Sequence, residues 1–231
     1  MQYKELLEAT KGLSWQETLE SFSSIEGVVF STSFSLEDQV ITDYIVSNKL
    51  NIEIFTIDTG RLFEETYKVW SETLKKYDIK IKTYYPQCEA LEGFVTTNGV
   101  NAFYNTKELR LECCNIRKVE PLNRALKNQK IWISGLRKEH SNDRLEKQHL
   151  EHDNSLNIIK YYPLLDVDLK NIWNIIKNNN IPYNALYKSG FNSIGCAPCT
   201  KSGEGRSGRW WWEEGHKECG IHIVNGKIIR N

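Results

Sequence analysis

Features that would mark a membrane protein or a nucleic-acid-binding protein are missing from this chain. No apolar run approaches the roughly 18 residues that a membrane-spanning helix needs. Residues 1–5 are partly charged and begin no apolar stretch, so we predict no signal peptide and a cytoplasmic location. The formal net charge is zero, which argues against nucleic acid as the partner. There is also no internal repeat and no low-complexity linker.

The length and composition are those of a globular protein. The chain has 231 residues, of which 40% are hydrophobic and 26% charged, enough for one large domain or one domain with an extension. Charge is uneven: residues 1–70 carry twelve acidic and five basic side chains, and residues 106–147 carry six acidic and eleven basic ones. A basic middle suits a small anionic substrate, although two solvated faces of opposite charge are the simpler explanation of the asymmetry alone.

Strand and helix patterns alternate along most of the chain. We expect strands at residues 27–30, 52–57, 79–84, 131–133 and within 158–165, and helices at 14–22, 35–45, 63–77, 113–126 and 168–178. This order predicts an α/β fold with a doubly wound, mostly parallel sheet covered on both faces. Periodicity fades after residue 182. We therefore predict a nucleotide-binding α/β domain over residues 1–182 and an irregular C-terminal tail over residues 183–231.

Two loops follow predicted strands and suit an anionic ligand. The hydroxyl-rich stretch 31–38 leads into a helix, and free backbone N–H groups at a helix N-terminus bind phosphate or sulfate. The signal is weak alone, because Ser and Thr are also ordinary helix caps. The second loop, Asp58–Arg61, follows the next strand. Ligands in doubly wound sheets bind at such strand ends, although a simple turn allowed by Gly60 would look the same.

Six cysteines are present, and four of them form two close pairs. Cys113 and Cys114 are adjacent, and Cys196 and Cys199 form a Cys-x-x-Cys motif. In a reducing cytosol we expect no disulfide framework. Four thiolates can hold one metal centre, and an adjacent pair suits an iron–sulfur cluster better than one zinc ion, while zinc, a vicinal disulfide and free thiols remain alternatives. Lys118, one helical turn after Cys114, is placed to offset the charge of a cluster, unless it only belongs to a solvated basic face.

The two remaining cysteines lead to different expectations. Cys219 is close in sequence to Arg206, Arg209 and His222, and nearby cations make a thiol more nucleophilic by lowering its pKa. An incidental exposed thiol is the alternative. Cys88 has no basic neighbours and lies in an amphipathic helical pattern, so we expect it to be a small buried hydrophobic residue.

Taken together, the motifs resemble those of the assimilatory sulfonucleotide reductases, in particular the iron–sulfur branch that reduces adenylyl sulfate (APS). The matching stretches are Ser-Phe-Ser-Leu-Glu-Asp at 33–38, Asp-Thr-Gly-Arg at 58–61, Cys-Cys-Asn-Ile-Arg-Lys at 113–118, Ser-Gly-Leu-Arg-Lys at 134–138, Gly-Cys-Ala-Pro-Cys-Thr at 195–200 and Glu-Cys-Gly-Ile-His at 218–222.

The resemblance implies an adenine-nucleotide hydrolase-like fold and a role for each matching residue. A [4Fe-4S] cluster would be held by Cys113, Cys114, Cys196 and Cys199, with Lys118 between the cluster and the substrate. The nucleotide would be bound by Thr32, Ser33, Asp58, Thr59, Gly60 and Arg61, and the phosphosulfate by Arg137, Arg206 and Arg209. Cys219 would be the nucleophile, with His222 beside it in the catalytic segment.

The resemblance also implies a reaction and partners. APS would be cleaved to AMP with an S-sulfocysteine on the enzyme, and a thioredoxin or glutaredoxin-type thiol would release sulfite for cysteine biosynthesis. A homo-oligomer is left open. Ser35 and Lys138 stand where relatives often have Gly and Arg, and the first loop lacks the Gly-Gly of ATP-splitting relatives.

Three other functions compete with this one. They are a reductase of the 3′-phosphorylated substrate (PAPS), an iron–sulfur enzyme that thiolates tRNA, and a zinc-stabilised binding module. The cysteine set argues against the first, the absence of an ATP-binding loop and of a broad basic surface against the second, and the basic Cys219 segment against the third.

Overall fold

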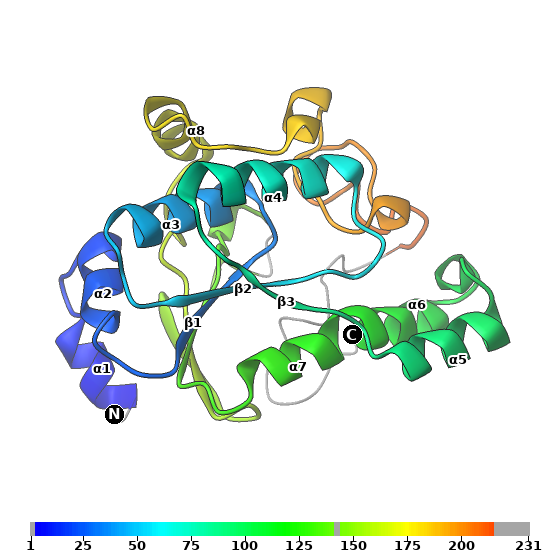
Figure 1. Ribbon diagram of the computed structural model, residues 1–231, viewed down its shortest axis with the longest axis horizontal. Helices are drawn as coiled ribbons and strands as arrows, with labels where there is room; N and C mark the ends of the chain where they lie inside the picture. The colour runs from blue at the N-terminus through cyan, green and yellow to red at the C-terminus, as the bar shows by residue number, and fades with distance from the viewer. Residues whose placement is uncertain (1–2, 141–143, 215–231) are drawn as a thin grey trace.

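The computed structural model describes residues 3–140 and 144–214 and has a mixed six-stranded sheet at its centre (Figure 1). The strands are β1 (Val28–Thr32), β2 (Glu53–Ile57), β3 (Lys82–Tyr84), β4 (Ile131–Ile133), β5 (Leu150–Asp153) and β6 (Ile158–Tyr161). Their order is β3-β2-β1-β4-β6-β5, and only the β5–β6 pair is antiparallel. The predicted fold class is therefore confirmed.

Helices cover both faces of the sheet. They are α1 (Tyr3–Ala9), α2 (Trp15–Phe22), α3 (Leu36–Ser47), α4 (Glu64–Tyr77), α5 (Cys88–Asn98), α6 (Lys107–Cys114), α7 (Glu120–Leu126) and α8 (Leu169–Asn178). None of the helices in the described ranges is long and apolar enough to cross a membrane. Figure 1 shows α3, α4 and α8 on one side of the strands and α5, α6 and α7 on the other.

Two hydrophobic layers hold these helices on the sheet. Phe30 and Ile133 are fully buried against Ile41 of α3 and Ile172 of α8 in the larger layer. The smaller layer packs side chains of α7 against the opposite face of the strands; its buried members are Val29, Phe55, Leu122, Ala125, Leu126, Trp132 and Ile158. Strands that are buried on both faces explain why their sequences are nearly continuous apolar runs.

The sequence-based boundaries are correct for most elements and wrong around the cysteine pair. Ser14 caps α2 through the predicted capping box with Glu17. However, Cys113 and Cys114 do not open a helix: they end α6, which begins at Lys107. A π-helical turn, η2 (Asn115–Val119), joins α6 to α7. The strand β5 and the start of α6 were not predicted, and β3 is shorter than the predicted strand 79–84.

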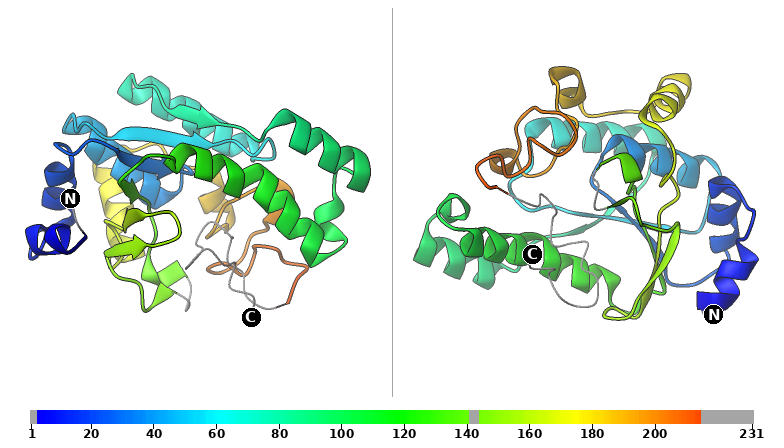
Figure 2. Two further views of the ribbon diagram at one scale, coloured as in Figure 1. Left: turned by 90° about the horizontal axis from the view of Figure 1, so that it is seen from below. Right: turned by 180° about the vertical axis from the view of Figure 1, so that it is seen from behind.

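The segment after α8 has no strand or α-helix of its own within its described part. It contains two short 3-10 turns, η5 (Ala185–Ser189) and η6 (Ala197–Cys199). Figure 2 shows this segment returning to lie between α4 and α6, next to the carboxyl end of the sheet. The Ala197 N–H donates to the Arg61 carbonyl over 2.8 Å, and the Tyr104 hydroxyl donates to the Pro198 carbonyl over 2.6 Å. The predicted division at residue 182 stays a prediction.

Candidate active site

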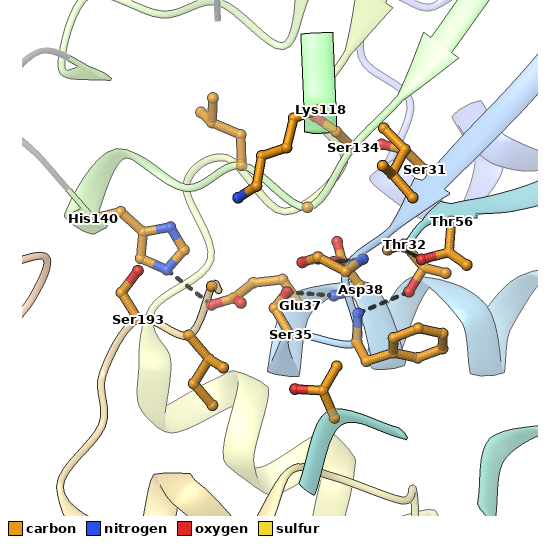
Figure 3. A pocket seen from close by; sticks show the side chains of 18 of the residues that line it. Ser31, Thr32, Ser35, Glu37, Asp38, Thr56, Lys118, Ser134, His140 and Ser193 are labelled. Atoms are coloured by element: carbon orange, nitrogen blue, oxygen red, sulfur yellow. Dashed lines mark hydrogen bonds and ion pairs between the residues drawn. The ribbon is translucent and has the colours of Figure 1, made fainter. Parts of the chain in front are cut away.

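A cavity of about 240 Å³ lies at the carboxyl ends of β1, β2 and β4 (Figure 3). Chain order reverses between β1 and β4, since β2 and β3 extend the sheet on one side and β6 and β5 on the other. Such a switch point is where open α/β sheets bind ligands. The loop after β1 and residues 134–136 after β4 both line the cavity.

Hydrogen bonds to Thr32 and to Asp38 of α3 fix the conformation of the loop after β1. The backbone N–H and the hydroxyl of Ser33 both donate to Asp38 Oδ2 over 2.7 Å. Phe34 adopts a left-handed backbone (φ +61°), and its N–H donates to the Thr32 hydroxyl over 3.1 Å. A bulky residue in this conformation is strained and persists only where its surroundings enforce it. Burial raises the pKa of Asp38, although the hydrogen bonds from Ser33 act to lower it.

One wall of the cavity is a buried network of acidic and basic groups. Glu37, only 3% exposed, accepts a 2.7 Å bond from Arg137 Nε and lies 3.1 Å from His140 Nε2. Although burial acts in the opposite direction, His140 and Arg137 hold the pKa of Glu37 at about 2. Arg144 Nη1 lies 3.2 Å from His140 Nδ1. Figure 3 shows the line between His140 and Glu37 along the cavity wall.

This network changes the picture of the predicted anion site. The Arg137 guanidinium is taken up by Glu37, Glu139 and the Val167 carbonyl, and Arg137 is not among the described residues that line the cavity. Arg144, which the sequence reasoning missed, does line it, together with His140. Arg137 belongs to the Ser-Gly-Leu-Arg-Lys motif, which made it a candidate. Arg144 comes seven residues later and belongs to none of the matching motifs.

Three other basic side chains line the cavity: Lys118, Arg206 and Arg209. Lys118 follows from the π turn, and Figure 3 shows its ammonium group pointing into the cavity. Arg209 is 5% exposed, and its guanidinium lies directly against Gly195. Together with Arg144, these side chains place four cations in the lining of the cavity, which favours a small anionic ligand.

The Asp58–Arg61 loop divides its residues between the cavity and the fold. Thr59 lines the cavity, and its hydroxyl lies 3.3 Å from Cys196 Sγ. Asp58 accepts from the Gly60 N–H over 2.7 Å and from the Tyr67 hydroxyl over 2.8 Å, which fixes the turn. Arg61 points elsewhere: it donates to the Val100 carbonyl and to Asn101 Oδ1 and lies over the Phe103 ring.

Three of the four paired cysteines lie in one buried cluster of side chains, and one of them, Cys196, contacts the cavity-lining Thr59. Cys113, Cys196 and Cys199 are each 8% exposed and share one buried cluster with Phe94, Ala102, Phe103 and Trp210, and Cys114 is partly exposed beside them. Burial is the main reason that the pKa values of the Cys113 and Cys199 thiols are raised, and the positive charge of Lys118 lowers that of Cys199. No three His, Cys, Asp or Glu side chains in the described ranges are close enough to hold a single metal ion.

The other two cysteines have different outcomes. Cys88 is exposed at the start of α5 and donates to Glu92 over 3.1 Å, so the expectation of a buried residue is wrong. The residue occupies the first turn of the helix, on the face that is open to solvent. Cys219 and His222 lie outside the described residues, and their roles stay predictions.

Comparison with known proteins supplies the family. The model of the phosphoadenosine phosphosulfate reductase domain matches residues 27–202. The chain belongs to this reductase family. An adenosine 5′-phosphosulfate reductase of Sinorhizobium fredii is 44% identical over 99% of the chain and 94% of its own length. Its counterpart in Neisseria meningitidis is 46% identical over 84% of the chain and 81% of its own length.

Solved structures agree with the family at the level of the fold. The chain is similar to the phosphoadenylyl-sulfate (PAPS) reductase of Candida auris, solved as a phosphate complex, with a TM-score of 0.74 and 28% identity over 86% of this chain and 96% of that one. FMN adenylyltransferase of Candida glabrata shares the fold alone, at a TM-score of 0.54 and 18% identity over 87% of this chain and 66% of that one.

Proposed function

We propose that this reductase acts on adenosine 5′-phosphosulfate and releases sulfite and AMP. The observation that supports it best is the cavity at the β1–β4 switch point, whose lining combines the hydroxyl side chains of the loop after β1 with the cations Lys118, Arg144, Arg206 and Arg209. The first group suits a ribose and a phosphate, and the second suits the charge that a phosphosulfate carries. The relatives with 41–46% identity carry the name of this activity.

The chemistry assigned to the chain is two successive thiol steps. The Cys219 thiolate attacks the sulfate sulfur, an S–S bond forms as the S–O bond to phosphate breaks, and AMP leaves with the electron pair. The product is an S-sulfocysteine. One thiolate of a thioredoxin- or glutaredoxin-type dithiol then attacks the Cys219 sulfur, and sulfite leaves with the electron pair of the broken S–S bond. The second thiol of the dithiol attacks the mixed disulfide, which frees the Cys219 thiolate and leaves the dithiol oxidised to a disulfide. Two electrons pass from that dithiol to sulfur.

The basic side chains of the cavity are assigned a role in the first step, the departure of AMP. Negative charge gathers on the phosphate oxygens as AMP departs, and positioned cations stabilise that charge in the transition state more than in the ground state. Lys118 and Arg209 are the strongest candidates. Both line the cavity, and their charges also act on the buried Cys199 thiol.

We propose further that the paired cysteines hold a [4Fe-4S] cluster. The donor set is entirely sulfur, three of the four residues are buried in one cluster of side chains, and they come from two chain segments. All-thiolate sets suit iron–sulfur clusters and zinc. When bound, the cluster would tie the end of α6 to η6 and supply negative charge beside the anion site. Cations act on three of these thiols: Lys118 and Arg209 on Cys199, Arg117 and Arg61 on Cys113, and Arg110 on Cys114.

The deciding experiment measures sulfite release from APS and from PAPS in parallel, with thioredoxin present. We expect APS to be the preferred substrate by a large factor in kcat/KM. Preference for PAPS would favour the other branch of the family, to which the Candida auris structure belongs.

A second experiment tests the nucleophile. Incubation with APS and no reductant is expected to add one sulfonate to the chain, on the peptide that contains Cys219, and thioredoxin is expected to remove it. The variant Cys219→Ser keeps the paired cysteines and the cavity but lacks the thiolate, so its turnover is expected to vanish. Cys88→Ser is the matched control, since Cys88 is exposed on α5. An adduct on Cys88 would contradict the assignment.

A further inference from the structure

A buried ion pair joins the helix that carries the cysteine pair to the last described turn of the chain. Arg110, in α6, donates from Nε to Glu213 Oε1 over 2.7 Å and from Nη2 to Oε2 over 2.9 Å. The two side chains are only 4% and 17% exposed. Two parallel bonds from one guanidinium to one carboxylate fix direction as well as distance. The pair therefore fixes this turn against α6 in one orientation.

The same guanidinium is surrounded by groups of the site. It lies 5.0 Å from the ring of Trp210, and it also interacts with the Cys114 thiol. The backbone N–H of Trp210 donates to the Cys199 carbonyl over 3.0 Å, and the Arg209 guanidinium lies 4.8 Å from the same indole ring. Arg110 therefore contacts a structural unit that includes a cavity-lining cation and the turn of the second cysteine pair.

Glu213 is important because it is the fixed point closest in sequence to Cys219 within the described residues. Six positions separate the two, so an extended chain places their Cα atoms at most about 22 Å apart. The position of Glu213 is the centre of the volume within which the Cys219 thiol can be presented to the substrate. If Glu213 were released, the next packed residue would be Trp212, whose ring lies 4.5 Å from that of Tyr104, so the direction in which the chain leaves this turn would change more than its reach.

We infer that Arg110 and Glu213 are positioning residues for the transfer of the sulfonate to Cys219. The inference rests on the proposed function, because it takes Cys219 as the nucleophile. The pair does not touch the substrate cavity: neither residue is among the described residues that line it. It acts by holding the base of the catalytic segment against α6, next to Trp210 and Arg209.

The size of the effect follows from the lost orientation. Breaking the pair removes the defined starting geometry of the catalytic segment, and a shift of about 1 Å costs up to about 100-fold in rate. We expect about a tenfold slower transfer when the pair is broken. APS affinity should change less than about twofold, because the cavity keeps all of its lining residues.

The test is a single-turnover measurement of adduct formation on Cys219, with APS in excess and no reductant. Glu213→Gln keeps the size of the side chain and removes its charge, and it leaves Arg110 beside Cys114. We expect the slower transfer described above, with wild-type iron content, a wild-type visible spectrum, and wild-type APS affinity when that is measured in a Cys219→Ser background. Arg110→Lys keeps the charge but not the two parallel bonds, so it should fall between Glu213→Gln and the wild type.

Two further variants keep the inference open to contradiction. The double variant Arg110→Gln/Glu213→Gln removes both charges, so neither is left buried without its partner. Because the two residues act through one interaction, the double variant should transfer the sulfonate no more slowly than the single variant Arg110→Gln. Arg124→Gln breaks the more exposed Arg124–Glu120 pair on α7 and should transfer at the wild-type rate.

The possible outcomes separate the inference from the proposed function. If the wild-type protein forms no adduct on Cys219, the proposed mechanism fails. If it does, and Glu213→Gln transfers at the same rate with the same iron content, the inference alone is overturned. It is also overturned if Glu213→Gln loses its iron together with its transfer rate, because the pair would then belong to the metal site.

Discussion

Gly195 packs directly against the guanidinium group of Arg209. A Cβ atom built on residue 195 would lie within 2.7 Å of three atoms of that group. The contact explains why the residue before the Cys-x-x-Cys motif has no side chain: only hydrogen leaves room for the arginine that lines the cavity. Gly195 thus sets the position of a cation that is remote in sequence.

The first prediction follows from this contact. Gly195→Ala is expected to displace the Arg209 guanidinium and to lower kcat/KM by about 100-fold, the order seen when one positioned charge donor is lost. Steady-state kinetics with APS will measure it. Gly93→Ala is the matched control: a Cβ there meets nothing within 4 Å, and in the interior of α5 alanine is favoured over glycine by about 0.5–1 kcal/mol. Equal kinetic constants for Gly195→Ala and Gly93→Ala would contradict the role assigned to Arg209.

Lys118 is expected to act on turnover more than on binding. Lys118→Ala removes a cavity-lining ammonium group, and loss of a charge that acts in the transition state costs about 3–4 kcal/mol. We expect kcat to fall by at least about 100-fold, with a smaller rise in KM. Lys82→Ala, which breaks an exposed ion pair with Glu53, should leave both constants unchanged. Wild-type kinetics for Lys118→Ala would return this lysine to an ordinary surface role.

Glu37 is expected to contribute to stability in a defined pH range. Glu37→Gln leaves Arg137 buried without its main partner, which costs about 3–5 kcal/mol of unfolding free energy. Because the folded-state pKa of Glu37 is lowered to about 2, its contribution is complete above the ordinary glutamate pKa of about 4.3 and is lost as the pH falls through about 2. The difference between variant and wild type should therefore be present at pH 7 and shrink as the pH falls below about 4.

Urea unfolding followed by circular dichroism measures this difference. Glu53→Gln serves as the control, since its exposed ion pair with Lys82 is worth at most about 1 kcal/mol. A loss of less than about 1 kcal/mol in Glu37→Gln would mean that the buried pair does not stabilise the loop after β1.

Metal content gives a fourth prediction. Protein purified without oxygen is expected to hold about four irons per chain and to absorb near 400 nm, as a single four-cysteine cluster does. Cys199→Ser is expected to lose the iron, because Cys199 is buried among the other thiols, whereas Cys88→Ser should keep it. Stoichiometric zinc with no iron would support the zinc alternative.

The sequence was enough to predict the five parallel strands but neither β5 nor the helix around the cysteine pair. Buried parallel strands are continuous apolar runs, and such runs mark β1, β2 and β4 clearly. The π turn leaves no such mark, and the contacts of its side chains are long-range. Arg117 donates to the Thr59 carbonyl over 2.5 Å, a contact across 58 residues that no local pattern reveals.

The motifs singled out six residues that line the cavity, namely Thr32, Ser33, Thr59, Lys118, Arg206 and Arg209. Asp58, Gly60, Arg61 and Arg137 come from the same motifs and are not among the described residues that line it. Local sequence could not predict which of two nearby arginines faces the cavity. Arg137 is held by Glu37, whereas Arg144 reaches the cavity beside His140, a choice set by the approach of α3 to the segment after β4. Gly135 permits that approach, since a Cβ there would overlap Asp38.

The π turn between α6 and α7 also limits how this gene can change in length. Each residue of an α-helix turns the chain by about 100°, and a π turn holds one residue more than an α-turn. Deleting one residue within Asn115–Val119 would turn the π turn into an ordinary α-turn and leave the two halves of the helix on their present faces. Deleting one residue within Lys107–Cys114 or Glu120–Leu126 would instead rotate one half by about 100°, so that either the cysteine pair would leave its buried partners or Leu122 and Leu126 would leave the sheet. Single-residue deletions should therefore be tolerated better in the π turn than in the two helices that it joins.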